Sequence, residues 1–104
     1  MAEVFDILSL IKLQVKTILP DAQVFLFGSR AYGHPTEESD WDILILTKGK
    51  HPKTTKRLIQ DRLFPISIEF SAFINLILVQ EEEWQTNAAY YALRKNIGSN
   101  LIAA

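Results

Sequence analysis

The chain has 104 residues, of which 48% are hydrophobic, and this is enough for one domain over residues 1–104 with a core of its own. Its 11 basic residues stand against 12 acidic ones, so the charge gives no sign of a general nucleic-acid binder. The absence of cysteine excludes disulfides, thiolate zinc sites and cysteine nucleophiles. Glu3 and Asp6 stand where a secretion signal needs basic residues, and no apolar run approaches the roughly 18 to 20 residues of a membrane span. We therefore expect a soluble cytoplasmic protein.

The first half of the chain predicts a helix followed by two strands. Residues 3–19 place apolar side chains at helical spacing, and a Pro-Asp pair then ends the helix. Residues 23–27, QVFLF, form a short apolar run rich in strand-forming residues. Residues 32–39 are rich in loop-forming residues, and residues 41–47, WDILILT, predict a second strand.

The segment after the second strand permits two interpretations. Residues 54–64 have a helical pattern that Pro65 interrupts, residues 66–70 (ISIEF) alternate like a strand, and residues 74–79 (INLILV) are a continuous apolar run. If INLILV is the third strand, residues 65–72 are the last turns of a helix kinked at the proline. If ISIEF is the strand, INLILV is a helix or a fourth strand. The continuous apolar run favours INLILV as the strand.

Residues 81–97 predict a closing helix. Its acidic first turn and basic last turn complement the helix dipole, and Gly98 follows as a C-cap. Four apolar or aromatic residues are expected to pack this helix onto the sheet: Tyr90, Tyr91, Leu93 and Ile97. With the preceding elements, this pattern is typical of a small α/β domain.

Two acidic residues stand where the second strand begins. Asp40 and Asp42 are two positions apart, so a strand directs both side chains to the same face. Carboxylates held that close repel each other and resist burial, and a divalent cation removes both problems. Mg²⁺ takes carboxylate, water and phosphate oxygens, and two such ions about 3.5–4 Å apart can stabilise the attacking and leaving oxygens of a phosphoryl transfer. Taken alone, paired acids at a strand end are more often solvated than functional.

The Gly-Ser pair that ends the first strand changes this balance. Gly28 has no Cβ, so the backbone can bend sharply and approach a ligand, and Ser29 offers a hydroxyl and a backbone N–H. If Arg30 and the next two residues begin a short helix, its N–H groups form an anion site, to which Arg30 could add a contact to phosphate. A Gly-Ser pair alone is an ordinary turn. A Gly-Ser turn about ten residues before an Asp-x-Asp strand sets a phosphate cradle beside a metal site.

These motifs resemble those of a known family. GSRAYG followed by SDWDILIL is similar to the signature of the DNA polymerase beta-like nucleotidyltransferases, in the minimal nucleotidyltransferase group. INLILVQEEEW and YALRKNIGSNLI are similar to the family's third strand, acidic turn and closing helix, so the resemblance covers nearly the whole chain. It implies an α/β (α+β) fold with a small mixed sheet flanked by helices. It also implies ATP or another nucleoside triphosphate as substrate, two Mg²⁺ ions, attack at the α-phosphate and release of pyrophosphate.

The resemblance also implies roles for individual residues. Gly28 and Ser29 would hold the triphosphate. Asp40 and Asp42 would ligate the metal ions and act in catalysis. Arg30 has no fixed place in the family pattern, so a phosphate contact and a solvated or ion-paired arginine both stay open.

The sequence departs from the family at the third catalytic acid. Active members carry a carboxylate on the next strand, where it helps to activate the attacking hydroxyl. If residues 74–79 form that strand, Asn75 or an apolar neighbour holds this place. Glu69 is the only acid in range of the alternative strand, and it is the candidate for a catalytic role; on a kinked helix it is exposed or reaches the site from one side. Without a third acid, metal binding weakens and the general base is missing or supplied elsewhere.

Two hypotheses of different class follow. The first is a Mg²⁺-dependent nucleotidyltransferase that transfers AMP from ATP to a protein, because some family members are antitoxins that adenylylate a helical HEPN-domain toxin. The second is a catalytically degenerate relative that acts by occupying a partner's surface. A transferase acting on RNA or a small molecule would need an acceptor site from another subunit. Direct nucleic-acid binding and membrane association are not expected, and a homo-oligomer is left open.

Overall fold

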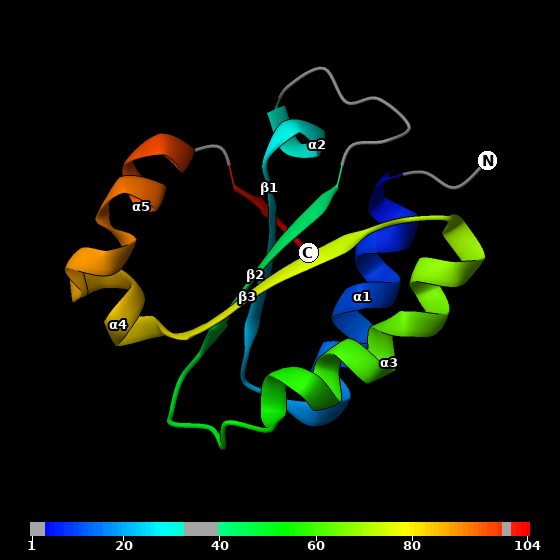
Figure 1. Ribbon diagram of the computed structural model, residues 1–104, viewed down its shortest axis with the longest axis horizontal. Helices are drawn as coiled ribbons and strands as arrows, with labels where there is room; N and C mark the ends of the chain where they lie inside the picture. The colour runs from blue at the N-terminus through cyan, green and yellow to red at the C-terminus, as the bar shows by residue number, and fades with distance from the viewer. Residues whose placement is uncertain (1–3, 33–39, 99–100) are drawn as a thin grey trace.

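A computed structural model describes residues 4–32, 40–98 and 101–104 of the chain. The elements are, in chain order, α1 (Val4–Ile18), β1 (Gln23–Phe27), α2 (Ser29–Tyr32), β2 (Trp41–Thr47), α3 (Thr55–Phe70), β3 (Ile74–Gln80), α4 (Glu81–Thr86), a 3-10 helix (Ala88–Tyr90), α5 (Tyr91–Ile97) and β4 (Ile102–Ala103). Figure 1 shows α1 and α3 side by side, α4 and α5 at the opposite end of the molecule, and α2 where β1 ends. No described helix is long and apolar enough to cross a membrane.

The four strands form one mixed sheet in the order β3-β2-β1-β4. β1 pairs antiparallel with β2 and with β4, whereas β2 and β3 are parallel. A parallel pair needs a long crossover, and α3 supplies it between β2 and β3. The predicted mixed sheet flanked by helices is therefore confirmed.

The sheet carries a hydrophobic core on each face. On one face, α1 and α3 pack against Trp41 and Ile43 of β2. On the other face, α4 and α5 pack against Leu44 and Leu46. Fully burying a Leu or Ile side chain contributes about 1.5–3 kcal/mol, so the apolar run of β2 stabilises both layers. Because side chains alternate along β2, Trp41 lies in the first core and Asp42 points to the opposite face.

The third strand is INLILV, as favoured from the sequence. α3 continues through Pro65 to Phe70, and ISIEF is helical rather than a strand. Leu63 and Ile66, on either side of the proline, are buried against the sheet, so tertiary packing holds the helix where the proline removes a backbone donor. Ser71 ends α3 in the left-handed conformation with φ of 51°, and the N–H of Ala72 donates to the carbonyl of Ser67 at 2.9 Å.

The prediction of one closing helix over residues 81–97 is wrong. Asn87 is extended, with ψ of 124°, and it separates α4 from the 3-10 helix and α5. The side chain of Asn87 accepts a hydrogen bond from the N–H of Ala89 at 2.8 Å. Asparagine favours such local bonds over a helix interior, so it starts a new helical segment where the charge pattern suggested continuity. Gly98 does cap α5, because its N–H donates to the carbonyl of Arg94.

The packing predicted for the last helix holds only in part. Ile97 is buried, and Tyr90 and Leu93 pack against the second core. Tyr91 was expected to pack on the sheet, but it is 58% exposed. Arg94 lies over its ring, with the guanidinium carbon 5.9 Å from the centroid. Adjacent residues of a helix point in different directions, so one of the two tyrosines packs against the core while the other faces solvent.

A fourth strand was not predicted. Residues 102 and 103 pair antiparallel with Leu26 and Phe25 of β1, and the N–H of Ala104 donates to the carbonyl of Val24 at 2.9 Å. Two residues are too few for a strand pattern to be recognised in a sequence. This short strand covers the edge of β1 that β2 leaves open.

Candidate functional site

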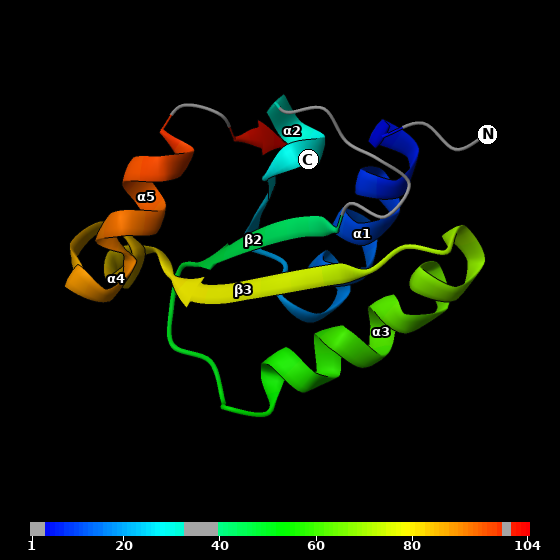
Figure 2. The ribbon, with the colours of Figure 1, turned by 45° about the horizontal axis from the view of Figure 1, so that its top comes forward.

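Three chain segments meet at one end of the sheet. Because β1 and β2 are antiparallel, the end of β1 lies beside the start of β2; because β2 and β3 are parallel, their starts are adjacent. The register places Phe27, Asp42 and Asn75 in one row across the three strands. Figures 1 and 2 show α2 following β1 at this same end. The topology thus brings the Gly-Ser turn and the Asp-x-Asp strand together.

Gly28 lies directly against the carboxylate of Asp42. A Cβ added at Gly28 would be 2.2 Å from Oδ2 of Asp42 and 3.1 Å from its Cγ, which is closer than real side-chain contacts. Gly28 also has φ of +80°, a backbone conformation that residues other than glycine rarely adopt. The backbone conformation favours glycine here, and any side chain would require the Asp42 carboxylate to move. The turn and the acid, which are separated in the sequence, are therefore in contact in the fold.

Asn75 joins the two acids. Its Nδ2 donates to Oδ2 of Asp40 at 2.7 Å and to Oδ1 of Asp42 at 3.3 Å. Strand geometry explains this contact, because Asn75 is the β3 partner of Asp42 and points to the same face. Donation to two carboxylates by one neutral amide holds both in place without neutralising their charge. Asn75 stands at the start of the third strand, where the family resemblance implies a third acid.

The electrostatics of Asp42 are unfavourable for a bare carboxylate. Burial raises the pKa of Asp42 above its usual 3.8, the hydrogen bond from Asn75 lowers the pKa in part, and the charge of Asp40 raises it further. Asp40 itself is exposed. The pair therefore combines one solvated acid with one half-buried acid, and a cation shared between them would relieve both the burial cost and the repulsion.

This donor set suits one divalent cation. Mg²⁺ is commonly held by one or two carboxylates together with water and substrate phosphates. Within residues 4–32, 40–98 and 101–104, no group of three His, Cys, Asp or Glu side chains is placed to hold a metal ion. Asp40 and Asp42 could therefore hold a cation whose remaining ligands come from phosphate or water.

The structure does not bring every candidate residue to this pair. Ser29 begins α2, and its side chain lies outside the described part of the structure. The guanidinium carbon of Arg30 lies 4.5 Å from the ring centroid of Trp41, which points away from the acid pair. Glu69 is exposed in the last turn of α3, and it does not join the two aspartates in a three-acid group. Asn75, in contrast, contacts both acids. The sequence alone could not show this contact, because it depends on the register of β2 and β3.

Comparisons with known proteins identify the family of the chain. A family profile described as a nucleotidyltransferase domain matches residues 8–95, which include Gly28, Asp40 and Asp42. A Methanocaldococcus jannaschii protein, provisionally named as a protein adenylyltransferase, is 35% identical over 81 residues, or 76% of this chain and 82% of the relative.

A solved structure supports the same fold. The crystal structure of a Sulfolobus solfataricus protein, provisionally assigned as a nucleotidyltransferase, superposes with a TM-score of 0.59 at 22% identity, over 95% of this chain and 79% of that one. The resemblance first seen in the Gly-Ser and Asp-x-Asp motifs is confirmed by the family profile over most of the sequence. This chain belongs to the nucleotidyltransferase domain family.

Proposed function

We propose that the chain transfers AMP from ATP to a protein acceptor in a Mg²⁺-dependent reaction. The observation that carries the proposal is the contact between Gly28 and Asp42, because it places a turn without a side chain directly against a carboxylate. Family membership supports nucleotidyl transfer, and the name of the Methanocaldococcus jannaschii relative supports a protein acceptor.

The residues divide the work between phosphate and metal. The missing side chain at Gly28 leaves room for the carboxylate of Asp42 against the turn, and the N–H groups that begin α2 are suited to an anion. Asp40 and Asp42 would hold Mg²⁺ on the same face. The bound ion would supply charge neutralisation to the triphosphate and to the departing pyrophosphate. This chain's contribution is thus to fix the α-phosphate beside two oriented carboxylates.

The transfer itself exchanges one phosphorus–oxygen bond for another. The oxygen of an acceptor hydroxyl forms a bond to the α-phosphorus, and the bond from that phosphorus to the bridging oxygen breaks, so pyrophosphate leaves with the electron pair. The hydroxyl proton must be lost in the process. The amide of Asn75 cannot accept it, because it is not basic at neutral pH. Asn75 therefore orients Asp40 and Asp42, and the proton goes to solvent or to a group of the acceptor.

Labelled ATP tests this proposal directly. The chain is incubated with ATP labelled in the α-phosphate, Mg²⁺ and the protein encoded beside it, for which a helical HEPN-type protein is the expected acceptor. Label should appear on the partner and disappear with Asp42→Asn. Asp21→Asn removes the same charge at an exposed position outside the site, so it serves as the matched control. Label transfer that survives Asp42→Asn would refute the assigned role.

The place of Asn75 favours one alternative, a binding subunit without catalysis. An amide stands where active relatives are expected to have their third acid. This amide donates hydrogen bonds to both aspartates. The same experiment separates the two functions. A binding subunit would form a tight complex with its partner, would leave no label on it, and would be indifferent to both Asp40→Asn and Asp42→Asn.

A further inference from the structure

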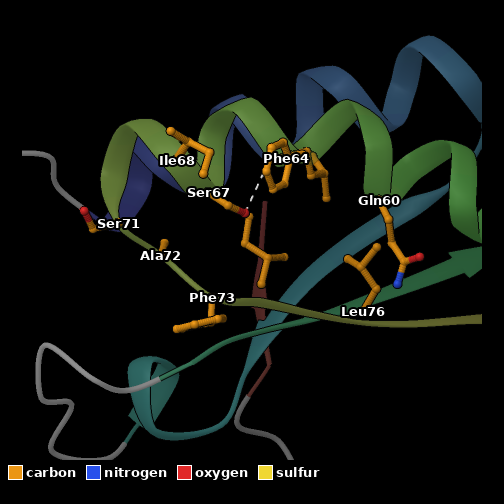
Figure 3. Close-up of a pocket in the computed structure, with 10 residues that line it drawn as sticks. Gln60, Phe64, Ser67, Ile68, Ser71, Ala72, Phe73 and Leu76 are labelled. Atoms are coloured by element: carbon orange, nitrogen blue, oxygen red, sulfur yellow. Dashed lines mark hydrogen bonds between the residues drawn. The ribbon is translucent and has the colours of Figure 1, made fainter.

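An apolar groove runs between α3 and the start of β3. Its volume is about 480 Å³. Figure 3 shows Phe64 and Ile68 on the helix side and Phe73 and Leu76 on the strand side. Every lining residue is uncharged: Gln60, Leu63, Phe64, Ser67, Ile68, Ser71, Ala72, Phe73, Ile74 and Leu76. The lining contains no cationic side chain that could bind a phosphate or a nucleic acid. The chemistry of the groove therefore suits another apolar surface.

Three large side chains of this groove are left in solvent. Phe64 is 62% exposed, Ile68 is 65% exposed and Phe73 is 78% exposed. Single exposed apolar residues are common on proteins, but a contiguous group beside a groove marks an interaction surface. Burying these side chains on association would stabilise the complex, because in the monomer they stay exposed to water.

The groove is bordered by the open edge of the sheet. β3 is the last strand in the order, and in the part of the chain that the structure describes no strand pairs with its outer edge. Figure 2 shows β3 in front of β2 with α3 beneath it. The strand INLILVQ contains no charged residue and no proline, which are the usual means of blocking an edge from pairing. The edge can therefore accept another strand.

We propose that this surface joins two copies of the chain, with β3 pairing antiparallel to β3 of the second copy about a two-fold axis. A two-fold interface brings the same patch of both copies together, so a charge near the axis would meet its like. The uncharged lining of the groove and the uncharged strand satisfy this requirement. On the α3 side of the joined sheet, Phe64 and Ile68 then pack against the second copy, and the two four-stranded sheets become one.

The interface leaves the two acid pairs on a separate face. Ile74 and Leu76 line the groove, while Asn75 between them contacts Asp40 and Asp42. Side chains that alternate along β3 therefore serve the dimer on one face and the candidate site on the other. The proposal does not depend on the reaction assigned to that site.

Sedimentation velocity of the full chain tests the proposal. We expect a concentration-dependent dimer that Phe64→Glu and Phe73→Glu each convert to monomer, since either change places a charge in the apolar interface. Leu13→Glu is the matched control, because Leu13 on α1 is 60% exposed and does not line the groove. Far-UV circular dichroism verifies that each variant is folded. A monomer at several hundred micromolar, or a dimer unaffected by both groove variants, overturns the proposal.

Disulfide trapping provides a second measurement, because the chain has no cysteine of its own. Single cysteines are placed in turn at Leu76, Ile77 and Leu78 and oxidised mildly. Antiparallel pairing about a two-fold axis at the middle of β3 brings one of these positions next to its own copy, within the 4.4–6.8 Å Cα separation of disulfides. We expect a cross-linked dimer from at least one of them and none from Leu13→Cys. Cross-linking at Leu13 alone, or at no position, contradicts β3 pairing.

Discussion

Replacing Gly28 by alanine tests whether the turn and the acid form one structural unit. The new Cβ would lie 2.2 Å from Oδ2 of Asp42, so either the carboxylate or the turn must move. In addition, the φ of +80° costs an L-residue roughly 1–2 kcal/mol. Overpacking a well-packed position adds about 1–3 kcal/mol. We therefore expect Gly28→Ala to lower the free energy of unfolding by about 2–5 kcal/mol.

Gly98→Ala separates the two contributions. Gly98 also has positive φ, at +57°, but a Cβ there would meet nothing closer than the carbonyl oxygen of Lys95 at 3.9 Å. This variant should lose only the backbone strain at φ of 57° and ψ of −125°, which is on the order of 1–3 kcal/mol. Gly49→Ala, with nothing within 4 Å, should change stability by less than about 0.5 kcal/mol. Gly98→Ala thus shows the size of a backbone effect without a side-chain contact, and the contact with Asp42 is isolated by the double variant below.

Urea unfolding followed by circular dichroism gives these free energies, and a double variant isolates the contact. In an Asp42→Ala background the two closest atoms are gone and only the Cβ remains, at 3.3 Å. Gly28→Ala should then cost about as much as Gly98→Ala does. The reasoning is refuted if Gly28→Ala and Gly98→Ala are equally destabilising, or if removing the Asp42 carboxylate leaves the cost of Gly28→Ala unchanged.

Three further predictions concern the acids. Since burial raises the pKa of Asp42 above 3.8, the folded chain binds that proton more tightly than the unfolded chain, and stability falls as pH rises through the raised value. Asp42→Asn should therefore increase the urea midpoint at pH 7, with the gain vanishing near pH 3; an equal gain at both pH values would contradict this assignment. Mg²⁺ should raise the melting temperature, by the equivalent of about 2.7 kcal/mol at a concentration 100 times its Kd, and a rise of the same size in Asp40→Asn would exclude the pair as the cation site. Asn75→Asp should melt lower than the unchanged chain without Mg²⁺ and gain more from its addition, because a third carboxylate adds repulsion that a cation removes; no extra gain in differential scanning fluorimetry would argue against Asn75 as the missing ligand position.

Much of the fold was predictable because its strands are strongly patterned. QVFLF and WDILILT appear in the structure with the predicted bounds, since continuous apolar runs suit strands that are covered on both faces. The choice between ISIEF and INLILV also followed from this rule, although Pro65 argued for an interruption that packing against the sheet overrides.

The candidate site was predictable only along the chain and not across it. The sequence places Asp40 and Asp42 on one face, and it suggests glycine for a close approach at residue 28. It cannot state that the approach is to Asp42, because this depends on antiparallel pairing of β1 with β2. For the same reason Asn75 could be noted as standing where an acid was expected, but its two hydrogen bonds required the parallel register of β2 and β3.

The pairing of the shortest strand has a consequence for synthesis of the protein on the ribosome. Leu26 pairs with Ile102, so the edge of β1 stays uncovered until residue 102 has been translated. β1 leads into Gly28, and the nascent chain therefore exposes an open strand next to its own candidate site while the residues between these two strands are synthesised. Pairing between residues so distant in sequence also forms slowly, because the entropy of closing the loop is lost before the contact forms. Translation speed and chaperone binding before residue 102 emerges should thus influence how much of the chain reaches the complete four-stranded sheet.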